Sequence, residues 1–255
     1  MLVLSAQGKI DFPIHLFCNV GDDSENPDTL AYIDKVSKPY AQEHGIELIE
    51  LYKITRSKEP LTLLESLAKP NTRSIGIPVR MADTGSPGNR KCTFDFKLKV
   101  MDTWLRTRGV TKDRPAITAV GISTDEIQRA NRGKGTPLQN RVHPLLDLGL
   151  SRNDCRRLIT EAGLPMPPKS SCYFCPFKRP QEFAEMRRDD PELFERAAQV
   201  EDLVNRTRDR IGADHVYLTR YGRPIREAVG PAQDQLFADD SGMDDGECDE
   251  GVCFV

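Results

Sequence analysis

Apolar and polar residues alternate in three short stretches of the chain, which is the pattern of a half-buried β-strand. These stretches are rich in β-branched and aromatic side chains and run from Ile14 to Val20, from Ile46 to Lys53 and from Ala116 to Ile122. Between them apolar residues recur every third or fourth position, which predicts amphipathic helices. We therefore expect an α/β fold, a Rossmann-like parallel sheet with helices on both faces.

Two helices are expected to cover this sheet. The first should begin after Asn26 as its N-cap, bend at Pro39 and end at Gly45. The second should begin at Thr93 and end at Gly109. Its core face is expected to carry Val100, Met101, Trp104 and Leu105.

The start of the chain does not fit the usual order of a doubly wound fold, which begins with a strand. Residues Met1 to Gly8 have the spacing of the last turns of a helix. We therefore expect that a strand and the loop that initiates this helix are missing from the sequence, either lost in evolution or cut off by a misplaced start.

Beyond residue 125 the pattern becomes mainly helical. Helices are expected from Ser151 to Ala162, from Gln181 to Arg188 and from Pro191 to Arg210, with Asp190 as a cap. We expect three parts, listed by residue number: an α/β core over 1–125, a helical C-terminal part over 126–230 and an acidic, cysteine-containing, mobile tail over 231–255.

The net charge of −3 conceals an uneven distribution, because residues 231–255 carry eight acidic and no basic side chains and leave +5 on the rest. This excess could steer an anionic substrate, but it is too small and dispersed for a nucleic-acid stripe, and a solvated surface of mixed charge is the favoured explanation. The apolar stretches are shorter than the roughly 18 residues of a membrane span. We expect a cytoplasmic protein.

Seven cysteines cannot all pair in disulfides within one chain. Cys172 and Cys175 form a Cys-x-x-Cys pair, a spacing that suits thiolate coordination of zinc or an iron–sulfur cluster. A redox disulfide, or two buried thiols, would have the same spacing.

Other cysteines favour the metal interpretation. Cys92 lies at an expected helix N-terminus after Arg90 and Lys91, where the positive charges should lower the pKa of the thiol. Cys248 and Cys253 form a second close pair in the tail. The remaining two are expected to be small core residues: Cys18 and Cys155.

Two loops follow the ends of expected strands, where open parallel sheets bind ligands. Both contain glycine for a close approach and side chains able to bond ribose or a base, although either loop could be a simple turn. The candidate ligands in the first loop are Asn19, Gly21 and Asp22, and those in the second are Gly121, Asp125, Glu126 and Arg129.

Taken in order, segments between residues 10 and 180 resemble the phosphoadenosine-phosphosulfate reductase family of the ATP-pyrophosphatase superfamily. The segments that carry the resemblance are Asn19-Val20-Gly21, Asn26-Pro27-Asp28-Thr29, Lys91-Cys92-Thr93 with Lys97, Gly121 to Arg129, and Cys172-Tyr173-Phe174-Cys175-Pro176. The resemblance implies an adenosine pocket at the first two segments and a substrate loop that ends in Arg129. The implied ligand is ATP or phosphoadenosine phosphosulfate.

The resemblance also implies a cluster site. The 79 residues between Cys92 and Cys172 are similar in number to those between the two cysteine groups of relatives with a four-iron cluster. It therefore implies a 4Fe-4S cluster held by Cys92, Cys172 and Cys175, with zinc as the alternative metal. Cys253 or Cys248 would be the fourth ligand, and Cys248 is otherwise the implied nucleophile, although Asp249 follows it where the family has glycine.

The chain departs from the family by lacking the phosphate loop, which Arg90, Lys91 and Arg129 would replace only in part. The resemblance implies a reductase-like enzyme that binds an adenine nucleotide and uses thiols in sulfur reduction or transfer, together with a thiol reductant protein as partner. Two alternatives remain. One is an ATP-dependent sulfurtransferase acting on nucleic acid, and the other is a non-catalytic, metal-stabilised binding module of a mobile-element or DNA-modification system.

Overall fold

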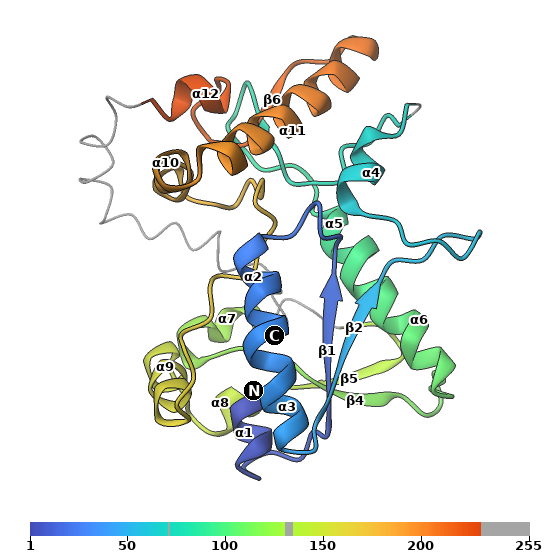
Figure 1. Ribbon diagram of the computed structural model, residues 1–255. Helices are drawn as coiled ribbons and strands as arrows, with labels where there is room; N and C mark the ends of the chain where they lie inside the picture. Colours follow the sequence, from blue (N-terminus) through green and yellow to red (C-terminus); the bar gives the residue numbers. More distant parts are fainter. Residues whose placement is uncertain (71, 131–134, 231–255) are drawn as a thin grey trace. The chain divides into compact units, whose positions relative to one another are not determined.

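The computed structural model describes all residues except 71, 131–134 and 231–255. It shows a mixed α/β protein whose strands, over these described ranges, form three two-stranded sheets (Figure 1). The chain divides into two compact units, each made of separate stretches of sequence. Within the described part, the first unit contains Met1–Pro60 and Asp95–Ser170, and the second contains Leu61–Phe94 and the residues from Ser171 onward.

The first unit contains two parallel strand pairs. β1 (Ile14–Asn19) pairs with β2 (Glu47–Tyr52), and β4 (Ala116–Ala119) pairs with β5 (Gln139–Val142). The three strands expected from the sequence are therefore confirmed, as is their parallel pairing in β1 and β2. β5 escaped the sequence analysis because its four residues are mostly polar and show no alternation.

The helices of the first unit are short. They are α1 (Leu2–Ala6), α2 (Pro27–Tyr32), a π-helical turn (Ile33–Ser37), α3 (Lys38–Glu43), α6 (Lys99–Thr107), a 3₁₀ turn (Thr124–Glu126), α7 (Ile127–Ala130), α8 (Pro144–Asp147) and α9 (Arg152–Glu161).

Helices cover both faces of the β1–β2 pair. Neighbouring residues of a strand point to opposite faces, and Glu50 of β2 contacts Lys38 of α3 while Leu51 packs into the cluster around α6. The buried members of that cluster are Cys18, Val100, Met101 and Leu105. α3 and α6 therefore lie on opposite sides of the pair, as Figure 1 shows.

Two details of the expected helices differ from the structure. The helix after Asn26 contains the π-helical turn Ile33–Ser37 directly before Pro39, because a wider turn accommodates a proline ring that an α-helix cannot. Thr93 is not a cap, since helical structure already begins at Lys91. Three residues of the expected core face of α6 are buried: Val100, Met101 and Leu105.

The second unit is mainly helical. Its helices are α4 (Leu63–Ala68), α5 (Lys91–Thr93), α10 (Pro180–Asp189), α11 (Pro191–Arg210) and α12 (Ile225–Ala228). β3 (Arg80–Met81) pairs antiparallel with β6 (Val216–Tyr217). A π-helical turn, Phe94–Leu98, follows α5, and its residues from Asp95 onward belong to the first unit. α11 has the predicted bounds, and Asp190 accepts the predicted capping bond from the N–H of Leu193 at 3.0 Å.

The three parts expected from the sequence do not coincide with the two units of the structure. The boundary after residue 125 lies inside the first unit, because α9 belongs to that unit while α10 and α11 belong to the second. The tail 231–255 lies outside the described residues. Over the described ranges, no helix is long and apolar enough to cross a membrane.

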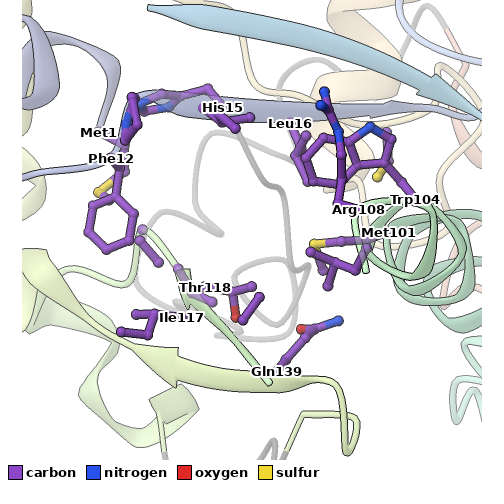
Figure 2. Close-up of a pocket in the computed structure, with 18 residues that line it drawn as sticks. Met1, Phe12, His15, Leu16, Met101, Trp104, Arg108, Ile117, Thr118 and Gln139 are labelled. Atoms are coloured by element: carbon purple, nitrogen blue, oxygen red, sulfur yellow. The ribbon is translucent and has the colours of Figure 1, made fainter. Parts of the chain in front are cut away.

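One parallel sheet was expected, but β1–β2 and β4–β5 are separate pairs in the described part of the chain. An apolar cavity of about 390 Å³ lies between β1 and β4 (Figure 2). Side chains of α6 close one wall of this cavity, among them Met101 and Trp104.

Candidate functional site

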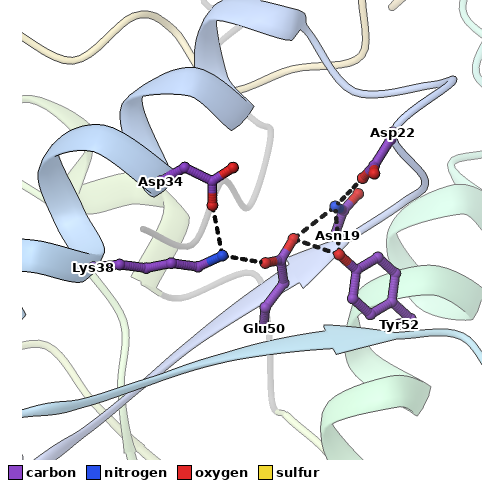
Figure 3. A network of polar contacts seen from close by, with 6 residues as sticks. All are labelled: Asn19, Asp22, Asp34, Lys38, Glu50 and Tyr52. Carbon is purple, nitrogen blue, oxygen red and sulfur yellow. Dashed lines mark hydrogen bonds and ion pairs between the residues drawn. The ribbon is translucent and has the colours of Figure 1, made fainter.

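A network of polar side chains lies at the carboxyl end of the β1–β2 pair (Figure 3). At its centre is Asn19, the last residue of β1, which is only 1% exposed. Its amide nitrogen donates to Asp22 Oδ1 at 2.8 Å, to Glu50 Oε1 at 2.8 Å and to the Tyr52 hydroxyl at 3.3 Å. The network therefore fixes one amide against three side chains from two strands and a loop.

One cation, Lys38, offsets part of the negative charge of this network. Lys38 of α3 bonds Glu50 at 2.8 Å and Asp34 at 2.6 Å. Burial acts to raise the pKa of Glu50, but bonds from Lys38, Asn19 and Tyr52 outweigh it and hold the pKa below its usual value. Glu50 is therefore an anion at neutral pH, able to accept hydrogen bonds from a ligand.

Tyr52 remains a neutral hydrogen-bond donor at the edge of the network. Burial, followed by the 2.7 Å hydrogen bond to Glu50, raises the pKa of the Tyr52 phenol to about 12. The side chain is partly exposed, so its ring also offers an apolar surface next to Asn19.

The loop after β1 makes a tight turn at Gly21. Its φ of +117° is a conformation that side-chain-bearing residues rarely adopt. The Gly21 carbonyl accepts from the N–H groups of Ser24 and Glu25, and the Gly21 N–H donates to Asn19 Oδ1 at 2.8 Å. This turn leads to Asn26, which caps α2 through the N–H of Asp28, as predicted.

The loop after β4 is held by helix α9. The N–H of Arg152, at the start of α9, donates to Asp125 at 2.6 Å and lowers the pKa of that carboxyl. Glu126 bonds the side chains of Arg129 at 2.7 Å and Arg152 at 2.8 Å. The structure thus brings Asp125, Glu126 and Arg129 together, with each engaged in contacts within the protein.

Gly121, the remaining predicted ligand of this loop, lies beside the apolar cavity. A Cβ at Gly121 would meet Met1 Cγ at 3.2 Å, so glycine permits a close approach between the two segments.

The Cys-x-x-Cys segment in the second unit forms a tight turn. The N–H of Cys175 donates to the carbonyl of Cys172 at 3.1 Å. Between them, Tyr173 and Phe174 are almost fully buried and their rings meet edge to face at 4.8 Å. The aromatic pair anchors the turn, while both thiol-bearing residues stay partly exposed.

The segment of Cys92 lies beside this turn. Arg90, two residues before Cys92, stacks on the ring of Phe177, two residues after Cys175, at 4.7 Å. The N–H of Cys92 donates to the carbonyl of Gly76 at 2.7 Å. The two cysteine segments predicted to share a metal are therefore neighbours within one unit.

Lys91, predicted to contact substrate, bonds the hydroxyl of Ser74 at 2.8 Å within the same unit.

The other cysteines follow the sequence analysis in part. Cys18 is buried, and burial raises the pKa of its thiol to about 11. Cys155 is only partly buried on α9. Cys248, the predicted nucleophile, and Cys253, a predicted metal ligand, lie outside the described residues.

Metal coordination by protein side chains is not complete within the described ranges, where no three His, Cys, Asp or Glu side chains lie close enough to hold one metal ion.

Sequence analysis missed four members of the Asn19 network: Asp34, Lys38, Glu50 and Tyr52. A signal was present for two of them. Glu50 and Tyr52 are two positions apart at the end of a parallel strand, so both point to one face at the edge where ligands bind.

Comparisons of the chain with models of known protein families, with curated proteins and with solved structures gave no match. The arrangement of its side chains is therefore what bears on its function.

Proposed function

We propose that the chain is an adenine-nucleotide-binding enzyme similar to the phosphoadenosine-phosphosulfate reductases, with thiols that act in sulfur reduction or transfer. The observation that carries the proposal is the Asn19 network, which stands at the carboxyl end of two parallel strands and beside a glycine turn. Open α/β sheets bind nucleotides at this edge. We also propose that the two parallel pairs belong to a Rossmann-like arrangement.

The nucleotide would be held by groups that the network orients. Asp22 is exposed next to Asn19 and can accept bonds from ribose hydroxyls. Glu50 is anionic and can accept a bond from an exocyclic amine, while Tyr52 supplies an aromatic face. Arg129 would contribute positive charge toward phosphate or sulfate.

The cysteines would hold a metal centre. Cys172 and Cys175 sit on one turn, and the segment of Cys92 lies beside them through the Arg90–Phe177 stack. An all-thiolate donor set fits a 4Fe-4S cluster or zinc, with Cys253 as the further ligand.

The sulfur step would use the thiolate of Cys248. Its attack on the sulfur of a sulfonucleotide forms an S–S bond, breaks the bond from sulfur to the phosphate oxygen and releases the adenosine phosphate. A protein dithiol then supplies two electrons, which releases sulfite, restores the Cys248 thiol and leaves the reductant as a disulfide.

Equilibrium binding of phosphoadenosine phosphosulfate and of ATP to the full chain tests the nucleotide proposal. We expect micromolar binding that falls at least tenfold in Asp22→Ala, an exposed position that the fold tolerates. Glu43→Ala, an exposed position at the end of α3, is the matched control and should bind normally. Equal binding by both variants, or none by the wild type, contradicts the proposal.

Product analysis separates the two kinds of sulfur chemistry. Sulfite released from phosphoadenosine phosphosulfate in the presence of a dithiol identifies a reductase. Pyrophosphate or AMP formed from ATP identifies a sulfurtransferase.

Iron, zinc and acid-labile sulfide content of anaerobically purified protein tests the metal proposal. Iron with equal sulfide, lost in Cys172→Ala and kept in Cys155→Ala, supports a cluster. Zinc without sulfide, lost in the same variant, would identify a structural site. Metal retained in Cys172→Ala would contradict the assignment of this ligand.

A further inference from the structure

The apolar cavity of the first unit lies between the edges of two strands. Side chains of a strand alternate between its two faces, so contact through a face would involve every second residue. Here consecutive residues line the cavity, namely residues 14–16 of β1 and 116–121 in and after β4. Each strand therefore presents an edge to the cavity.

The hydrogen bonds of β1 show which of its backbone groups point toward the cavity. In a parallel pair, alternate residues direct both their N–H and C=O toward the partner strand. The carbonyl of Pro13 accepts from the N–H of Glu47 in β2 at 2.9 Å. The backbone groups of Ile14, Leu16 and Cys18 consequently point away from β2, and these three residues line the cavity.

The same reasoning applies to β4. The N–H of Ala116 donates to Leu138 at 2.9 Å and that of Val120 donates to Val142 at 3.0 Å, on the β5 side. Ile117 and Ala119 therefore direct their backbone groups away from β5. Over the described ranges neither of these two edges pairs with a further strand.

Two polar side chains of the cavity wall add to these groups, and Figure 2 labels both of them. Gln139 is 5% exposed, and its amide nitrogen donates to Asp102 Oδ1 at 2.6 Å. Its carbonyl oxygen is buried and has no hydrogen-bond partner among the described residues, and the same holds for the hydroxyl of Thr118.

The remaining lining is mainly apolar. Phe12, Leu16, Met101 and Trp104 line the cavity. Burial, together with the nearby Met1 amino group, lowers the pKa of His15 to about 4, so its ring is neutral at physiological pH. Arg108 is charged but lies toward the solvent, where it stacks on Trp104 at 5.0 Å and pairs with Glu47.

These features favour an extended peptide over a small apolar molecule as the ligand of the cavity. A small apolar molecule would remove water from two rows of backbone N–H and C=O groups without replacing its hydrogen bonds, which is unfavourable. An extended peptide offers its own row of such groups and places alternate side chains against the apolar walls. About five residues match the length of β1 at roughly 3.3 Å per residue.

We propose that this cavity is a strand-acceptor site, which binds one extended, apolar segment of a second, different polypeptide chain. The segment pairs with the open edges of β1 and β4 and packs its side chains against α6. Neither the Asn19 network nor the cysteines proposed to bind metal or attack sulfur take part, so the proposal is independent of the proposed enzymatic function.

Trp104 provides the measurement, because it is the only tryptophan in the chain and it lines the cavity. The probe is a synthetic peptide of five alternating valine and isoleucine residues between terminal lysines, titrated into the full chain. We expect a saturable shift of the Trp104 emission to shorter wavelength. A peptide with proline at the central position removes one donor and should bind at least tenfold more weakly.

A pair of variants tests the edge directly. Ile117→Pro removes an N–H that faces the cavity and not β5, and it should weaken peptide binding at least tenfold. Ile117→Thr keeps the N–H and should bind within threefold of the wild type. Circular dichroism of both variants checks that the fold is retained. If Ile117→Pro fails to fold, the proline peptide still decides the question.

Three results would overturn the proposal. The first is no emission shift with the valine–isoleucine peptide. The second is equal binding of both peptides, which indicates apolar contact without strand pairing. The third is displacement of the peptide by cyclohexanol at millimolar concentration, which identifies a pocket for small molecules. Sedimentation must show that the protein stays the same size during the titration, since a concentration-dependent dimer would assign the open edge to a second copy.

Discussion

The guanidinium of Arg90 stacks on the ring of Phe177, with its central carbon 4.7 Å from the ring centroid. The two residues are far apart in sequence, but each is two positions from a cysteine, Cys92 in one case and Cys175 in the other. This stack holds side by side the two segments that would share a metal.

A double-mutant cycle measures the strength of this stack. We expect a coupling of about 0.5–1 kcal/mol between Arg90→Ala and Phe177→Leu in the free energy of unfolding, which is typical of a cation–π contact. The control pairs Arg90→Ala with Glu195→Ala, whose side chain bonds Arg226, and should be additive. A coupling energy near zero in the first cycle would show that the stack does not hold the two cysteine segments together.

Replacement of Asn19 tests the network at the end of β1. Asn19→Ala leaves Glu50, Asp22 and Tyr52 without a shared donor and should cost about 1–3 kcal/mol of stability. Asn19→Asp should cost more at pH 7, because it places a third carboxylate between Asp22 and Glu50.

The difference between these two Asn19 variants should shrink at acid pH, because protonation of the introduced aspartate removes its repulsion with the neighbouring carboxylates. Asn140→Asp makes the same change at an exposed strand position and should alter stability by less than about 0.5 kcal/mol. Denaturant titrations at pH 7 and pH 3.5 provide the measurement. If Asn19→Asp and Asn19→Ala lower the free energy of unfolding equally at pH 7, repulsion between the carboxylates is contradicted.

The stability of the second unit should depend on pH through Glu201. The side chain is 3% exposed and accepts N–H bonds from Leu218 at 2.7 Å and Ile225 at 2.8 Å. Burial is the dominant influence and raises the pKa of Glu201 to about 7. The folded state therefore binds the proton more tightly than the unfolded chain does.

It follows that this group contributes stability that is fully present below the pKa of the unfolded chain, near 4.5, and is lost as the pH rises through about 7. The loss should be on the order of 3 kcal/mol, at about 1.4 kcal/mol per pKa unit. The free energy of unfolding, measured from pH 4 to pH 8, should fall with rising pH in the wild type and in Glu192→Gln, an exposed change on α11, but not in Glu201→Gln. If the same fall is seen in Glu201→Gln, other groups cause it.

Asp125 is predicted to stabilise the start of α9. Asp125→Ala removes the acceptor for the Arg152 N–H and should lower the melting temperature, whereas Asp125→Asn keeps an acceptor and should change it less. Thermal unfolding with and without nucleotide distinguishes this role from ligand binding. If Asp125→Asn matches the wild type without nucleotide but is less stabilised by it, Asp125 also contacts the ligand.

Sequence alone determined the local elements of the fold. Alternation in the stretch from Ile14 to Val20 predicted β1, and the cap at Asp190 predicted the start of α11, because caps and apolar spacing act within a few residues. The thiol pair of Cys172 and Cys175 was also readable, since a turn holds both residues together.

Tertiary structure decided which distant segments meet. Asn19 was predicted as a ligand, but its partner Glu50 depends on the register of β1 with β2, which no local pattern specifies. The stack of Arg90 on Phe177 and the cavity between β1 and β4 likewise depend on how helices and strands pack. Packing and strand register involve residues far apart in the chain, so periodicity and motifs predicted the parts of this protein, and the tertiary structure alone showed what they bring together.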